Sequence, residues 1–331
     1  MQLVTINSNQ IAATKTAANL ETAAAHAAKA HAKNTNRSYQ NDLKLVSSYF
    51  PNFVNSTYQV ITPLTSTDVA AFLGHLISNG YTDKKGLTQQ YKPATLNRIT
   101  ATISTIHKVS NLDSPINKTV RAIVTGYGKT LNEGEPYKQK QAKGIKNNAI
   151  TKAINKDVFD LTTNRGTRDK AILLVGFTAA LRRNEIASLK VSNLVFDAEG
   201  VLISLDNTKT GDRENYVYLA NDIETCTVTA LKKWIAAAKL TKDSYLFPTI
   251  IKGDTIDTTT HIAGETVRRI LVATFGRSYS GHSLRVGAAQ TAHEEGHSID
   301  SIRQMLGHKT DRQTVKYLTK TTAKKVAIKM F

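Results

Sequence analysis

The chain has 331 residues, more than one compact domain usually holds, and its 40% apolar and 21% charged residues are typical of folded globular proteins. This composition excludes fibrous and wholly disordered chains. Its 44 Lys and Arg residues outnumber 26 Asp and Glu residues, which gives a formal net charge of +18. Such an excess favours a polyanionic partner, with a generally basic protein or a membrane-surface binder as the alternatives on charge alone. Both halves are basic, since residues 1–140 hold 15 basic and 7 acidic side chains.

The cysteine content and the apolar runs restrict the compartment. Cys226 is the single cysteine, so an intramolecular disulfide is excluded, and no Cys/His spacing is typical of a zinc site. Charged residues interrupt the alanine-rich stretch over 11–33, which therefore lacks the apolar core of a secretory signal. No apolar run approaches the roughly 20 residues that a membrane-spanning helix needs. We expect a cytoplasmic protein, associated with the nucleoid if its partner is DNA.

The first part of the chain predicts a flexible tail over 1–20 and a helical domain over 21–138. Apolar residues recur at helical spacing over 35–49, and Pro51 ends that helix. Ser66 and Thr67 can cap the next helix. Its apolar stripe consists of Val69, Phe72, Leu73, Leu76 and Ile77.

Pro93 suits the first turn of a further helix, and another helix is expected over 117–130. The helix that starts at Pro93 has a polar, basic face opposite its apolar one. Arg98, Thr102 and Lys108 on this face are candidate contacts to DNA phosphates, although an ordinary solvated helix face has the same pattern. The predicted core face consists of Leu96, Ile99, Ile103, Ile106 and Val109.

A change of composition predicts a domain boundary near residue 140. Asn, Gly, Glu, Pro, Lys and Gln replace the apolar periodicity over 131–148, which indicates an exposed basic linker, placed at 139–148. A second domain then covers 149–331. Helices are expected near residue 150 and over 169–181, 227–238 and 263–275, with two strands over 201–205 and 216–219 around a turn.

Several residues whose side chains could take part in catalysis follow one another through the second domain. Arg182 and Glu185 are three residues apart, and Lys209 lies in the turn between the two strands. His282 and Arg285 are also three apart, a spacing that places two side chains on one helix face. Gly307 suits the end of a helix, where a left-handed residue is favoured. It is followed by His308, and Tyr317 comes nine residues after that histidine.

This ordered set resembles the catalytic signature of the tyrosine recombinases, also called phage integrases. The resemblance rests on Leu-Arg-x-x-Glu, a hairpin lysine, Ser-Gly-His-Ser-x-Arg-Val-Gly-Ala-Ala, Leu-Gly-His and a following tyrosine. It implies a mainly α fold with a small β-sheet in the catalytic domain, in which two domains form a C-shaped clamp around DNA. It also implies a core-binding domain over 21–138, a catalytic domain over 149–331, and a homotetramer on paired sites in double-stranded DNA. No cofactor and no metal ion is implied.

The residue types fit cleavage of a phosphodiester. Arg182 and Arg285 can each donate paired hydrogen bonds to a phosphate, and His308 can add a third donor. Tyr317 is the expected nucleophile and forms a covalent 3′-phosphotyrosine, as the resemblance implies. His282 is the candidate base, and Lys209 the candidate acid for the leaving 5′ oxygen. Glu185 is interpreted as a group that orients a catalytic side chain.

Three alternatives remain open at this stage. A type IB topoisomerase would use the same tyrosine chemistry, although His-x-x-Arg with Leu-Gly-His favours the recombinase. A DNA-binding protein without catalysis would explain the charge but leaves the ordered residues as coincidence. Arg213 shares the turn with Lys209 and is the alternative hairpin residue, and many relatives have glycine where this chain has Ala180. The target sequence and the biological outcome of the reaction cannot be derived from these residues.

Overall fold

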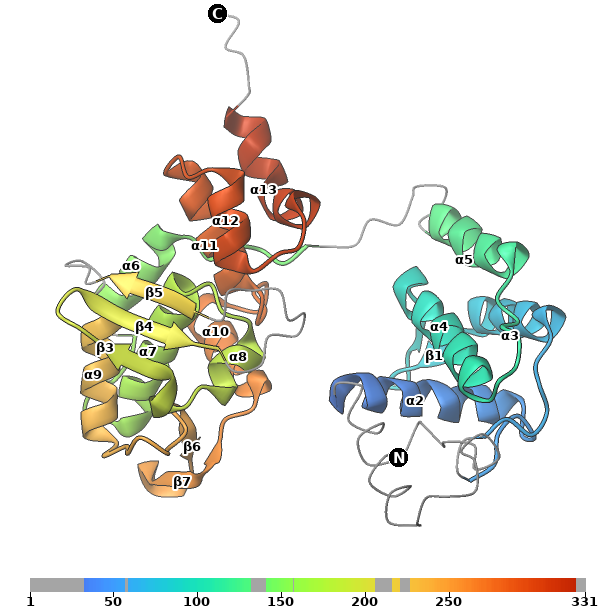
Figure 1. The fold of residues 1–331 in the computed structure, drawn as a ribbon, viewed down its shortest axis with the longest axis horizontal. Coiled ribbons are helices and arrows are strands. Elements are labelled where there is room, and N and C mark those ends of the chain that lie inside the picture. Colours follow the sequence, from blue (N-terminus) through green and yellow to red (C-terminus); the bar gives the residue numbers. More distant parts are fainter. Residues whose placement is uncertain are drawn as a thin grey trace, which may run out of the picture. The chain divides into compact units, whose positions relative to one another are not determined.

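A computed structural model describes residues 33–56, 59–131, 141–156, 158–205, 216–220 and 227–325. The chain divides into two compact units, Met1–Gln139 and Lys140–Phe331. Both consist mainly of helices, and small antiparallel sheets complete them, so the expected mainly α fold is confirmed (Figure 1). The predicted tail over 1–20 and most of the alanine-rich stretch lie outside the described residues.

The N-terminal unit contains four described helices, α2 (Lys33–Tyr49), α3 (Ser66–Asn79), α4 (Pro93–Val109) and α5 (Lys118–Thr130). A short hairpin of β1 (Tyr81–Thr82) and β2 (Thr88–Gln89) joins α3 to α4. The helices expected from 35, 66, 93 and 117 are therefore confirmed.

The helix starts and core faces of this unit follow from local chemistry. Thr65, one residue before the expected caps, begins α3: its side chain accepts from the Asp68 amide, and the Asp68 carboxylate accepts in return from the Thr65 amide. The predicted stripes of α3 and α4 supply most of the core, although Val109 is exposed. The fully buried members are Val69, Phe72, Leu73, Leu96, Ile99 and Ile103.

The C-terminal unit begins with α6 (Asn147–Asn155), α7 (Asn164–Thr178) and α8 (Arg183–Ser188), then the 3-10 turn η2 (Val191–Asn193). An antiparallel sheet follows, formed by β3 (Leu194–Phe196), β4 (Gly200–Ser204) and β5 (Tyr216–Ala220) in that order. The two expected strands are β4 and β5, which pair with Val201 opposite Leu219. The sequence did not predict β3, because three residues carry too little periodicity.

The rest of the unit is α9 (Thr227–Ala237), the hairpin of β6 (Pro248–Ile250) and β7 (Ile256–His261), and four further helices. The turn η3 (Lys252–Asp254) joins β6 to β7. The helices are α10 (Gly264–Phe275), α11 (Ser283–Glu294), α12 (Ile299–Leu306) and α13 (Asp311–Lys325). Among the helices of the described ranges, none is both long enough and apolar enough to span a membrane.

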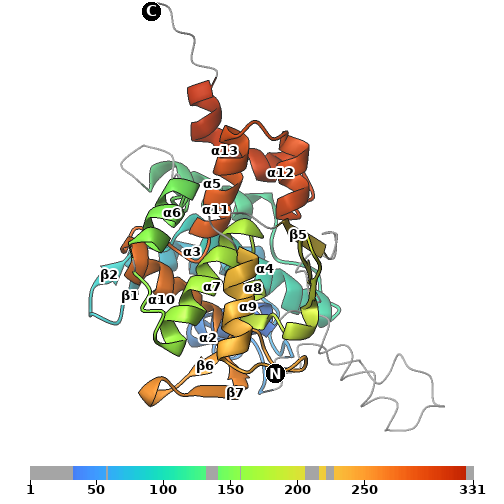
Figure 2. The ribbon, with the colours of Figure 1, turned by 90° about the vertical axis from the view of Figure 1, so that its left-hand side faces the viewer.

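Helix α7 is the centre of this unit and contacts α6, α8, α9, α10 and α11 (Figure 1, Figure 2). Seven consecutive residues, 171–177, are buried, as expected of a helix surrounded on all sides. Beside it lies the single tryptophan, Trp234 of α9, which is fully buried and donates its indole N–H to the Leu246 carbonyl at 2.7 Å.

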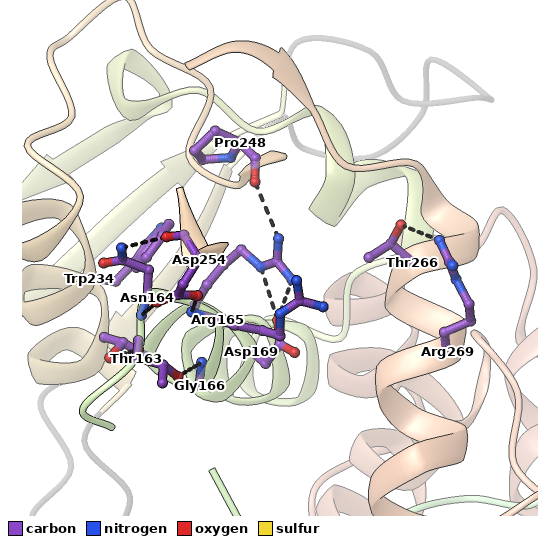
Figure 3. Close-up of polar contacts among 12 residues, drawn as sticks. Thr163, Asn164, Arg165, Gly166, Asp169, Trp234, Pro248, Asp254, Thr266 and Arg269 are labelled. Carbon is purple, nitrogen blue, oxygen red and sulfur yellow. Dashed lines mark hydrogen bonds and ion pairs between the residues drawn. The ribbon is translucent and has the colours of Figure 1, made fainter. Parts of the chain in front are cut away.

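The β6–β7 hairpin fixes the N-terminus of α7 (Figure 3). The Asp254 carboxylate accepts hydrogen bonds from the backbone amides of Asn164 at 2.6 Å and Arg165 at 3.0 Å. These amides are among those that a helix start leaves without internal partners. One turn on, buried Arg168 donates to the Pro248 carbonyl at 3.4 Å. The hairpin therefore anchors the helix whose other end leads to Arg182.

The end of the expected linker is docked onto α11, so the expectation of an exposed segment over 139–148 is wrong there. Ile145 is fully buried, its amide donates to the Ser283 carbonyl at 2.9 Å, and α6 already begins at Asn147. Gly287 makes this close approach feasible, because a Cβ at that position would lie 1.7 Å from the Ile145 carbonyl oxygen. Backbone cannot move aside as a side chain can.

We predict that Gly287→Ala lowers the free energy of unfolding of the C-terminal unit by about 2–3 kcal/mol, since overpacking exceeds the ~1 kcal/mol gain in helix propensity. Gly176→Ala in α7 is the matched control. Its new methyl would meet the side-chain ends of Leu284 and Ile186 at 2.7 and 2.8 Å, and these can rotate. Denaturant unfolding followed by Trp234 fluorescence measures both variants. Equal losses in the two would contradict the backbone-contact argument.

Candidate active site

A surface cleft of the C-terminal unit brings together four of the predicted site residues. Arg182, His282, His308 and Tyr317 all line it, although they are widely separated in the chain. The sequence had not identified Lys309, Gln313 and Lys316, which line it as well. The sequence could have indicated these residues only through their closeness to the motif, because Lys309 follows His308 and Gln313 lies one helical turn before Tyr317.

Arg182 stands at the turn between α7 and α8, with Glu185 beneath it. The Glu185 carboxylate accepts from the Arg182 backbone amide at 2.7 Å and from the guanidinium at 2.6 Å. Glu185 is 8% exposed and Arg182 is 23% exposed. The carboxylate thus caps α8 and holds the arginine fork at the same time. This is the geometry of an orienting residue, and it leaves the guanidinium facing the cleft.

His282 immediately precedes α11, whose first residue is Ser283. The Ser283 amide donates to the Ser280 carbonyl at 2.9 Å, so a tight turn carries the imidazole to the cleft. The protein around His282 lowers its pKa, first because it removes water from the ring and then because Arg285, Arg182 and Arg183 are positive. Glu185 opposes this effect. The imidazole is consequently neutral at neutral pH and can accept a proton.

Arg285 has a different environment from the one the sequence suggested. It is 1% exposed and is not among the residues that line the cleft. Its guanidinium donates to the Ala180 carbonyl at 2.8 Å and to the Leu306 carbonyl. Those carbonyls lie in the segments that lead to Arg182 and to His308. Arg285 therefore joins these two segments from beneath the cleft.

His308 and Tyr317 are in direct contact. Their rings lie edge to face, with centroids 5.3 Å apart, and His308 Nδ1 is 3.0 Å from the Thr314 hydroxyl. Gly307 ends α12 in the left-handed region at φ +56°, as its position predicted. Gln290 of α11 donates to the Tyr317 carbonyl at 3.0 Å. The phenol thus comes from the interior of α13 and is held beside a histidine.

Lys209 and its alternative Arg213 lie outside the described residues, so their place is not part of this geometry. The candidate DNA contacts belong to α4 in the N-terminal unit. Lys108 is exposed there, and Arg98 is partly exposed and paired with Asp42 at 2.5 Å.

Thr102 does not lie on the exposed face where the sequence placed it. It is fully buried, and its hydroxyl donates to Asp42 at 2.9 Å. Burial raises the pKa of the Asp42 carboxyl, while the Thr102 hydroxyl and the Arg98 charge act in the opposite direction. The expectation of a phosphate contact from this threonine is wrong because α2 supplies a buried acceptor for it.

We predict that Arg285→Lys lowers both stability and any phosphodiester cleavage, because an ammonium is a point charge that cannot span the two carbonyl groups. The expected loss is about 2–4 kcal/mol in the free energy of unfolding, measured by Trp234 fluorescence. Arg182→Lys is the control. It should reduce cleavage while stability stays within about 1 kcal/mol, since that pair is partly exposed. Comparable stability in the two variants would refute the bridging role.

Comparison with known proteins agrees with this arrangement. A family model described as the phage integrase family matches residues 146–324. An integrase/recombinase xerD homolog of Selenomonas ruminantium is 30% identical over 175 residues, which are 49% of this chain and 50% of that protein. The chain thus spans about half the length of this curated relative.

Two solved structures share the fold across most of the chain. The XerH site-specific recombinase, in a post-cleavage complex with a palindromic difH substrate, superposes with a TM-score of 0.57 at 17% identity, covering 94% of this chain and 84% of that one. A lambda integrase dimer bound to a COC′ core site gives 0.51 at 17% identity, covering 88% and 91%. The family match extends over more than half of the chain, and the chain therefore belongs to the phage integrase family.

Proposed function

We propose that this protein is a site-specific DNA recombinase that cleaves and rejoins double-stranded DNA through a 3′-phosphotyrosine at Tyr317. The observation that supports it most is the single cleft lined by Arg182, His282, His308 and Tyr317. A phosphate in that cleft would meet both cationic donors and a phenol. Such preorganised donors lower the energy of the charge that builds up on phosphate oxygens during displacement.

In the proposed reaction the Tyr317 oxygen attacks phosphorus and the bond to the 5′ oxygen breaks. The phenol proton passes to His282, whose lowered pKa keeps it in the accepting form. The leaving 5′ oxygen takes a proton from Lys209, with Arg213 as the alternative donor. Attack by a 5′ hydroxyl from a second duplex reverses these steps. The phosphodiester energy is retained in the tyrosyl ester, so strand exchange needs no ATP.

Arg182 and His308 would hold the non-bridging oxygens of the scissile phosphate. Glu185 keeps the Arg182 fork in place, as their two short contacts support. Arg285 adds its charge from beneath the cleft and fixes the two segments above it. Because a guanidinium stays charged at any working pH, the contribution of the two arginines does not titrate away.

The proposed substrate is a pair of recombination sites, bridged by four copies of the chain. Structural neighbours support this: one is described as a lambda integrase tetramer bound to a Holliday junction, with a TM-score of 0.50. We further propose that the N-terminal unit is a core-binding domain that contacts DNA phosphates through Lys108 and Arg98, and that the enzyme works in the cytoplasm at the nucleoid. The net charge of +18 suits this role.

We predict that a nicked suicide substrate traps a covalent protein–DNA adduct, which Tyr317→Phe abolishes while DNA binding persists. The phenylalanine retains the ring contact with His308 but has no oxygen to attack phosphorus. Denaturing gel electrophoresis detects the adduct, and a mobility shift checks binding. Tyr279, which lies between α10 and α11 with its ring against Phe275, serves as the control and should be replaceable by phenylalanine without loss of the adduct. An adduct in Tyr317→Phe would refute the proposal.

A plasmid assay with the wild-type protein distinguishes a recombinase from a topoisomerase. A recombinase needs two copies of its site, whereas a type IB topoisomerase would relax any supercoiled plasmid. Genomic DNA flanking the gene supplies the candidate inverted repeats. Relaxation of a plasmid without such sites, at the rate seen with them, would favour the topoisomerase.

We predict that single-turnover cleavage at subsaturating DNA, which reports the free protein, falls at acid pH with a midpoint below the ordinary histidine value of 6.5. The direction of this pH dependence follows from the lowered pKa, because His282 then binds its proton only at lower pH. The neutral base therefore remains active down to that lower midpoint. Rates between about pH 5 and about pH 8 measure the midpoint. His308→Asn should retain this acid limb at a reduced rate, and a limb that disappears in this variant would reassign it to His308.

A further inference from the structure

Arg183 directly follows Arg182 but leads away from the cleft. It is 46% exposed, does not line the cleft, and lies 3.6 Å from the Glu265 carboxylate of α10. Glu265 in turn pairs with Arg268 at 2.6 Å. Exposed ion pairs of this kind contribute little to stability. The ion pair with Glu265 therefore does not by itself give Arg183 a role in stability.

The aliphatic part of the Arg183 side chain, called its stem here, packs against two glycines. A Cβ at Gly281 would lie 2.6 Å from the Arg183 Cδ, and a Cβ at Gly264 would lie 3.1 Å from its Cγ. Any larger residue at Gly281 would displace the stem. Gly264 is the first residue of α10, and Gly281 stands directly before His282. The stem thus covers the backbone of the turn that presents the proposed base.

The Arg183 charge also acts on His282. The charged groups around α8 and α11 that influence this imidazole are Arg285, Arg182, Arg183 and Glu185, of which only Glu185 raises its pKa. The groups that line the cleft with it are His308, Lys309, Lys316 and Tyr317. Like Arg285, Arg183 does not line the cleft, but it differs from Arg285 in being exposed and paired with a carboxylate, Glu265.

We propose that Arg183 is a positioning residue for His282, acting through the Gly281 backbone that its stem covers and through the charge that Glu265 holds beside the cleft. Its catalytic consequence rests on the proposed function, whereas its effect on His282 is a property of the free protein. The cationic cleft residues face the substrate, and Arg183 faces the turn behind the base. Its two parts, stem and charge, can be separated by substitution.

The test uses Arg183→Met, which keeps most of the stem and removes the charge, Arg183→Lys, which keeps both in part, and Arg183→Ala, which removes both. NMR titration of the His282 ring protons, assigned by their loss in His282→Gln, gives its midpoint without DNA. We expect the midpoint to rise by roughly 0.5 pH unit in the methionine and alanine variants. It should stay near the wild-type value in the lysine variant. Arg268→Met, which removes the other partner of Glu265, is the control and should also leave it unchanged.

A second measurement isolates the stem. Amide exchange at Ser283, whose N–H bonds the Ser280 carbonyl, should accelerate several-fold in Arg183→Ala and stay unchanged in Arg183→Met. The acid limb of single-turnover cleavage should follow the NMR midpoint. A His282 midpoint unchanged in Arg183→Met, or amide exchange unchanged in Arg183→Ala, would overturn the proposal. If both shift as expected but the wild-type protein does not cleave DNA, the positioning role stands and the proposed function fails.

Discussion

The geometry of the cleft depends on one buried cation, Arg285. Burial of an unpaired guanidinium is strongly unfavourable, so its contacts with the Ala180 and Leu306 carbonyls are required as well as useful. Both carbonyls lie where helices end, after α7 and at the last residue of α12. Helix ends leave such carbonyls without internal partners and carry partial negative charge. A single side chain thereby satisfies the last carbonyl of α12 and a carbonyl of the turn after α7, and it fixes the segments that carry Arg182 and His308.

Two left-handed residues turn the chain from those helix ends toward the cleft. Gly307 adopts φ +56° at no steric cost, whereas Ala180 adopts φ +48°, which costs about 1–2 kcal/mol for an L-residue. Ala180 is also fully buried, so its methyl group recovers part of that cost. Because its carbonyl accepts from Arg285, the strained turn is held in place by the same bond that satisfies the buried cation. This explains how the turn before Arg182 persists with an alanine in the left-handed region.

Sequence periodicity predicted most helices of both units, and the ordered motif predicted four residues of the cleft. Neither pattern revealed contacts between segments that are distant in the chain. Thr102 was assigned to a solvated face because its own helix cannot reveal that Asp42 of α2 lies opposite. Ile145 was assigned to a linker because its docking partner is α11, far along the chain. The spacing of Arg285 from His282 gives its helix face, whereas its depth beneath the cleft depends on the segments packed over it. Lys309 and Lys316 carried no pattern of their own.

The charge distribution of the cleft favours the binding of an anion. Among its described lining residues Arg182, Lys309 and Lys316 are cationic, and none is acidic. Glu185, the carboxylate paired with Arg182, is already committed to that residue. Like charges gathered in one cleft repel one another, so an anion that binds there relieves this repulsion as well as forming new contacts. Burial of the ring, followed by the charges of Arg285, Arg182 and Arg183, keeps His282 neutral. Arg182 therefore contributes both to the attraction of an anion and to preserving the base that would activate Tyr317.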